Sequence, residues 1–235
     1  MTKTLITGAN KGLGYEAARR LTAAGHTVYL GARDPGRGRE AAMRIGARFV
    51  ELDVTSDDSV SAAALAIEAD GGLDVLINNA GVAERTPAGS YAPATDETAD
   101  SLRSTFETNV FGVVRVIRAF LPLLEKSSVP VIVNVSSGLS LTRELIRGDS
   151  PTSLFPGIGY PASKAALNVI TVQYAKAFPG IRINAVGPGF TATDLNSNTG
   201  TQSVQKGAEV IVRMAQISPH GPSGGFFDRR GAITW

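Results

Sequence analysis

The chain has 235 residues, of which 43% are hydrophobic and 19% are charged, and its 23 basic and 21 acidic residues leave a net charge of +2. This length and apolar content predict a single domain over residues 1–235 with a sizeable core, and they exclude a peptide hormone or a multi-module protein. No block of five like charges occurs, and the chain has two histidines and no cysteine, so we expect neither a nucleic-acid partner nor a metal centre.

Short apolar strands alternate with longer, alanine-rich helical segments along the chain. The strands are expected at residues 5–7, 27–30, 49–52, 75–77, 131–135 and 181–186, with a last one near 224–228. The helices are expected at residues 13–24, 36–45, 56–68, 97–125, 160–178 and 203–216, with Pro122 ending or kinking the fourth. This alternation predicts an α/β fold, a doubly wound parallel sheet of the Rossmann type with about seven strands and helices on both faces.

Two long stretches, 138–159 and 188–202, are rich in Gly, Pro, Ser and Thr and are expected to be irregular. Long loops in a compact domain are commonly functional, so we expect both near a site. The N-terminus is interrupted by polar residues too early for a signal peptide, and no apolar run approaches the ~18 residues of a membrane span. We therefore expect a cytoplasmic protein without a membrane segment.

A glycine-rich turn follows the first strand, with the sequence Thr7-Gly8-Ala9-Asn10-Lys11-Gly12-Leu13-Gly14. Glycines between a strand and a helix let the backbone approach a pyrophosphate, and the helix N-terminus supplies free N–H donors. The turn is therefore a candidate dinucleotide site. Its spacing differs from the general G-x-G-x-x-G pattern, and three glycines alone also fit a structural turn.

Two further turns follow strands at the same predicted edge of the sheet. Asp53 and Val54 come at the end of the third strand, where Asp53 either accepts a hydrogen bond from an adenine amino group or caps the next helix. After the fourth strand, Asn79, Ala80 and Gly81 either allow another close approach to a cofactor or fasten the turn. Neither turn decides between its two roles by itself.

The end of the second strand, Arg33-Asp34, bears on which dinucleotide is bound. A carboxylate there binds the ribose 2′-hydroxyl of NAD, whereas a guanidinium accommodates the 2′-phosphate of NADP. Asp34 precedes Pro35, and we favour a helix-cap role for it. Arg33 and Lys11 could together flank one dianionic phosphate. We predict NADPH/NADP⁺ as the cofactor, against the alternative that both cations are solvated surface charges.

Tyr160 and Lys164 form the one Tyr-x-x-x-Lys pair in the chain. On a helix these positions share a face, so the ammonium is expected to favour the phenolate and lower the phenol pKa; a surface Tyr–Lys pair is the alternative. Upstream, Ser136 and Ser137 end the fifth strand, where their hydroxyls could donate to a substrate carbonyl or make an ordinary turn. Asn109 is a poor helix former in an apolar helical stretch, and it could simply hydrogen-bond locally.

Together, the glycine loop, the Asn-Asn-Ala-Gly turn, the strand-end serines and the Tyr–Lys pair resemble the short-chain dehydrogenase/reductase family over essentially the whole chain. The resemblance implies that the Thr-Gly-x-x-x-Gly-x-Gly loop binds the cofactor. It also implies a catalytic tetrad, in which the second serine of the pair takes part. Its members here are Asn109, Ser137, Tyr160 and Lys164.

The resemblance extends to the cofactor. The stretch after the sixth strand looks like the family's Pro-Gly loop, in which Pro188, Gly189 and Thr193 would hold the nicotinamide amide. Lys11 and Arg33 are similar to the cations of the NADPH-preferring, carbonyl-reductase-like branch. This branch binds a small-molecule carbonyl or alcohol as its substrate.

The activity implied by the resemblance is the reversible, NADPH-dependent reduction of a ketone or aldehyde. Tyr160 would give a proton to the carbonyl oxygen, with Ser137 hydrogen-bonded to that oxygen. Lys164 would lower the phenol pKa and bind nicotinamide-ribose hydroxyls, and Asn109 would hold a water that resupplies the proton. The alternatives are a non-catalytic NADPH-binding sensor and an extended-branch sugar-nucleotide epimerase. The complete tetrad speaks against the first, and the short stretch after the Pro-Gly loop against the second.

Ser137 and Tyr160 stand 23 positions apart, farther than in the commonest members of the family. This implies an insertion within 138–159, of a kind that in carbonyl-reductase-like members can cover the helix face used for dimerisation. A monomer and a homo-oligomer therefore both stay open. Residues 154–158 of the insertion either form one wall of an apolar substrate pocket or make a packed loop.

Overall fold

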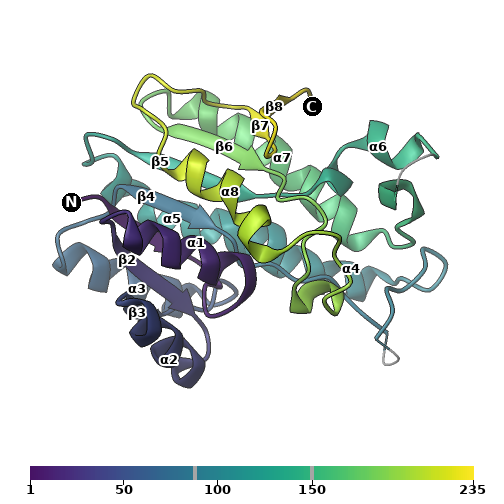
Figure 1. Cartoon of the computed structure of the whole chain (residues 1–235), viewed down its shortest axis with the longest axis horizontal. Helices are drawn as coiled ribbons and strands as arrows, with labels where there is room; N and C mark the ends of the chain where they lie inside the picture. Colours follow the sequence, from purple (N-terminus) through teal and green to yellow (C-terminus); the bar gives the residue numbers. More distant parts are fainter. Residues whose placement is uncertain (87–88, 149–150) are drawn as a thin grey trace.

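The structure, a computed structural model, describes residues 1–86, 89–148 and 151–235. Within them, eight strands form one sheet in the order β3-β2-β1-β4-β5-β6-β7-β8, and neighbouring strands are parallel except for β7 and β8 (Figure 1). The strands are β1 (Lys3–Ile6), β2 (Thr27–Ala32), β3 (Arg48–Glu51), β4 (Val75–Asn78), β5 (Val131–Val135), β6 (Arg182–Val186), β7 (Phe226–Phe227) and β8 (Ala232–Ile233). The predicted doubly wound sheet is confirmed, with one strand more than expected.

Helices cover both faces of the sheet (Figure 1). One face carries α1 (Gly12–Ala23), α2 (Pro35–Ile45) and α8 (Val204–Ala215), and the other carries α3 (Asp57–Ala69), α5 (Gly112–Leu124) and α7 (Gly159–Ala177). Strand β4 shows why: Val75 and Ile77 join the first apolar cluster, and Leu76 joins the second. Alternate side chains of a strand point to opposite faces, so a strand buried on both sides carries apolar residues on both, and in β4 only the last residue, Asn78, is polar. Within the described residues, no helix is both long enough and apolar enough to cross a membrane.

The long helix predicted over 97–125 is divided into α4 (Ala99–Phe106), a π-helical turn (Glu107–Phe111) and α5. It begins two residues later than expected because Thr98 and Ser101 form a capping box, in which each side chain accepts the backbone N–H of the other. Helix α5 ends at Leu124, two residues after Pro122. The π-helical turn is not visible in the periodicity of the sequence, and it contains the predicted tetrad asparagine.

A buried polar chain fixes α7 over the sheet. Asn78 Nδ2 donates to Asn134 Oδ1 at 2.9 Å, and Asn134 Nδ2 donates to Thr171 Oγ1 at 2.9 Å. These residues come from β4, β5 and α7, and all three are at most 2% exposed. Buried polar groups favour the one arrangement in which each finds its partner, so the chain sets the register of α7 against β5.

The carboxyl ends of the parallel strands, where α/β folds bind ligands, meet at one end of the molecule. Figure 1 shows α4 and α6 (Thr142–Ile146) at this end, on the right of the view. The stretches 138–159 and 188–202, expected to be irregular, contain short helical turns as well as loops. These are Gly138–Ser140, α6 and Pro151–Leu154 in the first stretch and Asp194–Asn196 in the second.

Candidate active site

A cavity of about 600 Å³ lies at the carboxyl ends of the strands, within the size range of small-molecule and cofactor sites. Its walls come from the glycine loop, the strand ends and both long loops. All but two of the predicted site residues line it: Gly8, Asn10, Lys11, Gly12, Leu13, Arg33, Asp53, Val54, Asn79, Ala80, Gly81, Ser137, Tyr160, Lys164, Pro188, Gly189 and Thr193. The two that are not among its lining residues are Gly14 and Asn109.

The glycine loop presents free backbone donors to the cavity. Helix α1 begins at Gly12, and among the described residues no side chain caps its N-terminus and no acidic residue lies in its first turn. Gly8 and Gly12 have φ of +62° and +58°, in the left-handed region that favours glycine. A Cβ on Gly8 would lie 2.9 Å from Ala80 Cα. The loop therefore fits a pyrophosphate, which would accept hydrogen bonds from the exposed N–H groups.

Gly14 and Asn79 serve packing in the same loop. Asn79 Nδ2 donates to Thr7 O at 2.9 Å and to Gly8 O at 3.1 Å, so its side chain ties the end of β4 to the glycine loop. A Cβ on Gly14 would collide with Asn79 Nδ2 and would lie 3.0 Å from Ala9 Cα. Gly14 thus allows the start of α1 to pack against the Asn79 side chain, and that side chain performs the fastening role considered for it.

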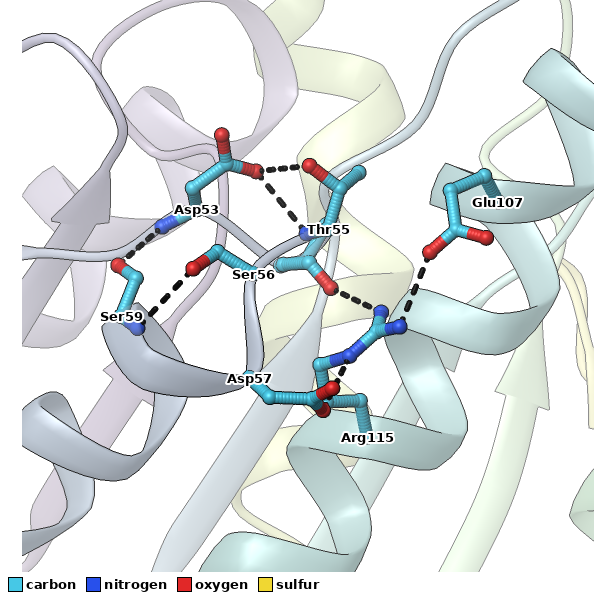
Figure 2. Close-up of polar contacts among 8 residues, drawn as sticks. Asp53, Thr55, Ser56, Asp57, Ser59, Glu107 and Arg115 are labelled. Atoms are coloured by element: carbon cyan, nitrogen blue, oxygen red, sulfur yellow. Dashed lines mark hydrogen bonds and ion pairs between the residues drawn. The ribbon is translucent and has the colours of Figure 1, made fainter.

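Asp53 lies where an adenine-binding acceptor was expected (Figure 2). Its Oδ1 accepts the backbone N–H of Thr55 at 2.9 Å and the Thr55 hydroxyl at 2.7 Å. The alternative capping role belongs to Ser56, whose side chain accepts a backbone N–H of α3 at 3.2 Å. Burial alone would raise the pKa of Asp53, but the bonds from Thr55 and the nearby charges of Arg33 and Arg115 hold that pKa below its usual value. The carboxylate is therefore ionised at neutral pH.

Behind Asp53, Arg115 joins three segments (Figure 2). Its guanidinium donates to Val54 O at 2.7 Å, to Asp57 Oδ1 at 2.7 Å and to Glu107 Oε1 at 3.0 Å. Gly112 lets the segments come close, since a Cβ there would lie 3.0 Å from Val54 Cγ2. Arg115 therefore sets the spacing between the loop after β3 and the π-helical turn.

The cations expected at the 2′-phosphate differ in their surroundings. Arg33 follows β2 directly, lines the cavity and, within the described residues, forms no ion pair. Asp34 caps α2, accepting Arg37 N at 3.0 Å, which confirms its capping role. Lys11 Nζ donates to Asp194 Oδ2 at 2.8 Å, a contact that sequence reasoning missed. One predicted phosphate ligand is thus free, and the other is paired.

Tyr160 and Lys164 lie on consecutive turns of α7, and both line the cavity. Lys164 is 4% exposed, its Nζ donates to Val135 O at 2.8 Å and lies 5.7 Å from the Tyr160 ring centre, and its burial lowers its pKa to about 8. Burial raises the pKa of Tyr160 to about 12, although a hydrogen bond with Ser137 acts in the opposite direction; nearby Tyr91 adds to the increase. The expected lowering of the phenol pKa is therefore wrong for this structure, because desolvation of the phenolate outweighs the stabilising contacts.

The two strand-end serines have different partners. Ser136 is 3% exposed, and its hydroxyl donates to Asn168 Oδ1 at 2.7 Å, on α7. Ser137 Oγ accepts Leu139 N at 3.2 Å, and Ser137 is close enough to Tyr160 to oppose the rise in the pKa of that phenol. The hydroxyl of Ser136 is committed to packing, whereas Ser137 Oγ lies beside the phenol.

Asn109 is fully buried in the π-helical turn. Its Oδ1 accepts Val82 N at 2.9 Å, and its Nδ2 donates to Val82 O at 2.9 Å and to Ser163 Oγ at 3.0 Å. These partners are 27 and 54 positions away, so the bonding is not local. Both amide hydrogens are engaged, so only Oδ1 can still accept a hydrogen bond from water. Gly81 fits beside it, since a Cβ there would lie 3.3 Å from Asn109 Oδ1 and 3.4 Å from Lys164 Nζ.

The insertion supplies a wall of the cavity. Leu154, Phe155 and Pro156 line it, as does Phe190 from the second loop. Leu154 is 78% exposed and Phe190 is 49% exposed, so these side chains are held only lightly by the rest of the molecule. The pocket-wall interpretation of the segment 154–158 thus agrees with the placement of its first three residues.

Sequence reasoning missed Tyr91, which lines the cavity, and Arg85, which contacts Tyr91. The Tyr91 ring lies 4.7 Å from the Phe155 ring, and the Phe155 ring lies 6.2 Å from the Tyr160 ring. Arg85 stacks on Tyr91 at 4.7 Å and donates to Leu195 O at 2.8 Å. Both residues belong to the stretch between β4 and α4, which has no periodic pattern, and no signal in the sequence singles them out.

Known proteins are similar to this chain over most of its length. The model of the short chain dehydrogenase family matches residues 2–204. The (+)-neomenthol dehydrogenase of Arabidopsis thaliana is 33% identical, over 96% of this chain and 95% of its own length. The salutaridine reductase of Papaver bracteatum is 31% identical, over 97% of this chain and 94% of its own length.

Solved structures of similar proteins share the fold of this chain. The salutaridine reductase of Papaver somniferum has a TM-score of 0.83 at 29% identity, and the alignment covers 96% of this chain and 99% of that one. The NADPH-bound carbonyl reductase from chicken fatty liver has a TM-score of 0.84 at 27% identity, with coverage of 100% and 99%.

Proposed function

The chain belongs to the short-chain dehydrogenase/reductase family, and we propose that it is an NADPH-dependent reductase of a ketone or aldehyde, acting reversibly. The observation that carries the proposal is that Tyr160, Ser137 and the buried Lys164 line the same cavity as the glycine loop. A proton donor and a dinucleotide site thus share one space. The names of two relatives, a neomenthol dehydrogenase and a salutaridine reductase, support an alcohol–carbonyl pair as substrate and product.

The glycine loop and strand ends would hold the cofactor. The N–H groups at the start of α1 would bind the pyrophosphate, and Asp53 would accept from the adenine amino group. Arg33 and Lys11 would flank the 2′-phosphate, which favours NADPH over NADH. Thr193, with the backbone of the Pro-Gly loop, would hold the nicotinamide amide. The NADPH-bound carbonyl reductase is similar over the whole chain, which supports this choice.

NADPH, when bound, supplies the hydride that reaches the carbonyl carbon. The hydroxyl of Tyr160 then gives its proton to the carbonyl oxygen and leaves a phenolate. With a pKa of about 12, Tyr160 stays protonated at neutral pH, as an acid must. Ser137 donates a hydrogen bond to the oxygen as negative charge develops there.

Lys164 and Asn109 support the proton transfer. Lys164, with a pKa of about 8, is cationic at neutral pH, and its charge stabilises the phenolate that remains after the transfer. It would also bind the nicotinamide-ribose hydroxyls. Asn109 anchors the π-helical turn to the Val82 backbone and to α7, and its Oδ1 would accept from the water that returns the proton.

A panel of carbonyl compounds tests the proposal. Menthone, an aliphatic aldehyde, an aromatic aldehyde and a quinone would be supplied to the purified protein, and NADPH oxidation would be followed by absorbance. We expect turnover of at least one of them, and Tyr160→Phe should lower kcat for it by ~10²–10⁴-fold while NADPH still binds. Tight NADPH binding without turnover of any panel member, or full activity of the variant, would contradict the proposal.

A further inference from the structure

Helix α7, which carries Tyr160, is capped from a distant part of the chain. Its N-cap is Ile158, whose side chain offers no hydrogen bond. The carboxylate of Glu97 takes that place: Oε1 accepts Ile158 N at 2.7 Å, and Oε2 accepts Gly159 N at 2.8 Å. Glu97 precedes α4 and is 61 and 62 positions from its two partners. One side chain therefore satisfies two donors at the start of this helix.

The charge of Glu97 suits this position. The first N–H groups of a helix have no partner within the helix, and the helix dipole makes that end partly positive. A carboxylate that accepts two of these N–H groups forms charge-assisted hydrogen bonds, which are shorter and stronger than neutral ones. Glu97 therefore holds the first turn of α7 more firmly than a hydroxyl cap would.

The glycines around Ile158 leave room for this carboxylate. A Cβ on Gly157 would lie 2.6 Å from Glu97 Oε1, and a Cβ on Gly159 would lie 3.0 Å from Glu97 Oε2. Alanine is the better helix former, by about 1 kcal/mol, so the helix itself gives no reason for glycine at position 159. The close approach of the Glu97 carboxylate explains why a glycine stands at position 159.

Glu97 also lies beside the catalytic end of the helix. Together with Tyr91, Phe155 and Tyr160 it lines a small void. A backbone bond from Ala94 N to Pro156 O, 2.9 Å long, joins the same two segments. The stretch before α4 and the end of the insertion are thus fastened together immediately before Tyr160.

We propose that Glu97 is a positioning residue for Tyr160: by fixing the first turn of α7, it places the phenol against Ser137 and the substrate oxygen. Tyr160 directly follows Gly159, so a shift of the capped turn moves the phenol with it. The inference rests on the proposed function, in which Tyr160 donates the proton. A misplacement of about 1 Å is enough to lower a rate by ~10²-fold.

The first test is Glu97→Gln, which keeps the shape of the side chain but replaces one acceptor oxygen with a donor. The assay uses menthone, or the panel carbonyl turned over fastest, with NADPH. We expect kcat to fall at least ~10-fold, with the Kd for NADPH changed by no more than about twofold. The matched control is Asp96→Asn, the same charge change at an exposed neighbour bonded to Thr95, and it should stay within about twofold of wild type. An unchanged kcat in Glu97→Gln, or an equal loss of NADPH affinity, would overturn the inference.

The second test combines Glu97→Gln with Tyr160→Phe. If Glu97 acts through the phenol, adding Glu97→Gln to Tyr160→Phe should lower kcat by no more than about twofold. A full additional loss would show a general structural role and overturn the inference. Should Tyr160→Phe itself leave kcat unchanged, the proposed function fails instead, so the two failures are distinguishable.

A third variant, Gly159→Ala, perturbs the same contact from the other side and serves if Glu97→Gln does not fold. Its added methyl displaces the carboxylate, so kcat should fall as in Glu97→Gln. The double variant Glu97→Gln/Gly159→Ala should be no worse than the more affected single variant. Wild-type kcat in Gly159→Ala would contradict the proposal.

Discussion

Lys11 and Asp194 form an ion pair between the glycine loop and the loop after β6, both of which line the cavity, with Lys11 Nζ 2.8 Å from Asp194 Oδ2. The side chains are 59% and 62% exposed, so the pair stabilises the fold by no more than about 1 kcal/mol. Lys11 is also one of the two cations proposed to bind the 2′-phosphate. Asp194 therefore competes with the phosphate for the same ammonium group.

Removal of this competitor should strengthen NADPH binding. In Asp194→Asn, Lys11 loses its ionised partner, and we expect the Kd for NADPH to fall about 2- to 5-fold while the Kd for NADH stays unchanged. Fluorescence titration with each nucleotide measures both constants. In a Lys11→Met background the same substitution should have no effect. Weaker NADPH binding in Asp194→Asn would show that the pair holds the loop in place rather than competing.

Arg33 should decide the choice between the two nucleotides. The variant Arg33→Asp replaces an unpaired guanidinium with an acceptor suited to the ribose 2′-hydroxyl. A charge-assisted bond is lost, so the ratio of kcat/KM for NADPH to that for NADH should fall about 10- to 100-fold. Steady-state kinetics with both nucleotides give the ratio. Arg44→Asp, at the far end of α2, is the control, and an unchanged ratio in Arg33→Asp would remove Arg33 from the site.

Arg115 should affect cofactor affinity and turnover together, since it bonds to the loop after β3 and to the π-helical turn. Arg115→Lys keeps the charge but cannot reproduce the forked donation to Val54, Asp57 and Glu107. We expect a loss of about 1–3 kcal/mol in the free energy of unfolding, a higher KM for NADPH and a lower kcat. Arg118→Lys, exposed on the same helix, is the matched control. A change in stability alone would limit Arg115 to a role in folding.

Lys164 should make stability depend on pH in the alkaline range. Its pKa is about 8 in the folded chain, compared with an ordinary lysine value of 10.5, a difference worth about 3 kcal/mol. Between these values the unfolded chain binds more protons at this residue than the folded chain does. The stability contribution of Lys164 is therefore lowest below pH 8 and recovers as the pH rises toward 10.5.

Lys164→Met removes this titration. The variant should be inactive yet more stable than wild type below pH 8. The gain in the free energy of unfolding should be at most about 3 kcal/mol, reduced by the free energy of the lost hydrogen bond to Val135 O. This advantage should shrink as the pH approaches 10.5. Urea unfolding of both proteins across the range measures it, and an advantage that does not vary with pH would contradict the lowered pKa.

The local sequence pattern predicted much of the fold and many of the residues that line the cavity. The run 131–135 is apolar except for Asn134 because β5 is buried on both faces, and both of its predicted ends match the structure. Tyr160 and Lys164 could be found because the i, i+4 relation of a helix is visible in the sequence. The glycine loop could be found because its glycines stand directly between a predicted strand and a predicted helix.

Contacts between distant segments could not be predicted. The π-helical turn at Asn109 has the composition of an ordinary helix, and the bonds to Val82 and Ser163 that accompany it depend on the tertiary fold. Glu97 was predicted as the first residue of the long helix, whereas it precedes α4, and its partners come about 60 residues later. The pKa of Tyr160 was predicted in the wrong direction because burial of the phenol cannot be deduced from its neighbours in sequence.

Two of the apolar side chains that line the cavity contribute little to the stability of the fold. Leu154 and Phe190 line the cavity yet remain largely in contact with solvent, so replacing them removes little buried apolar area. Substitutions at these two positions should therefore change the free energy of unfolding very little. Under the proposed function, a lineage or a saturation library can therefore change which carbonyl compound the cavity accepts while the sheet and its helices stay intact.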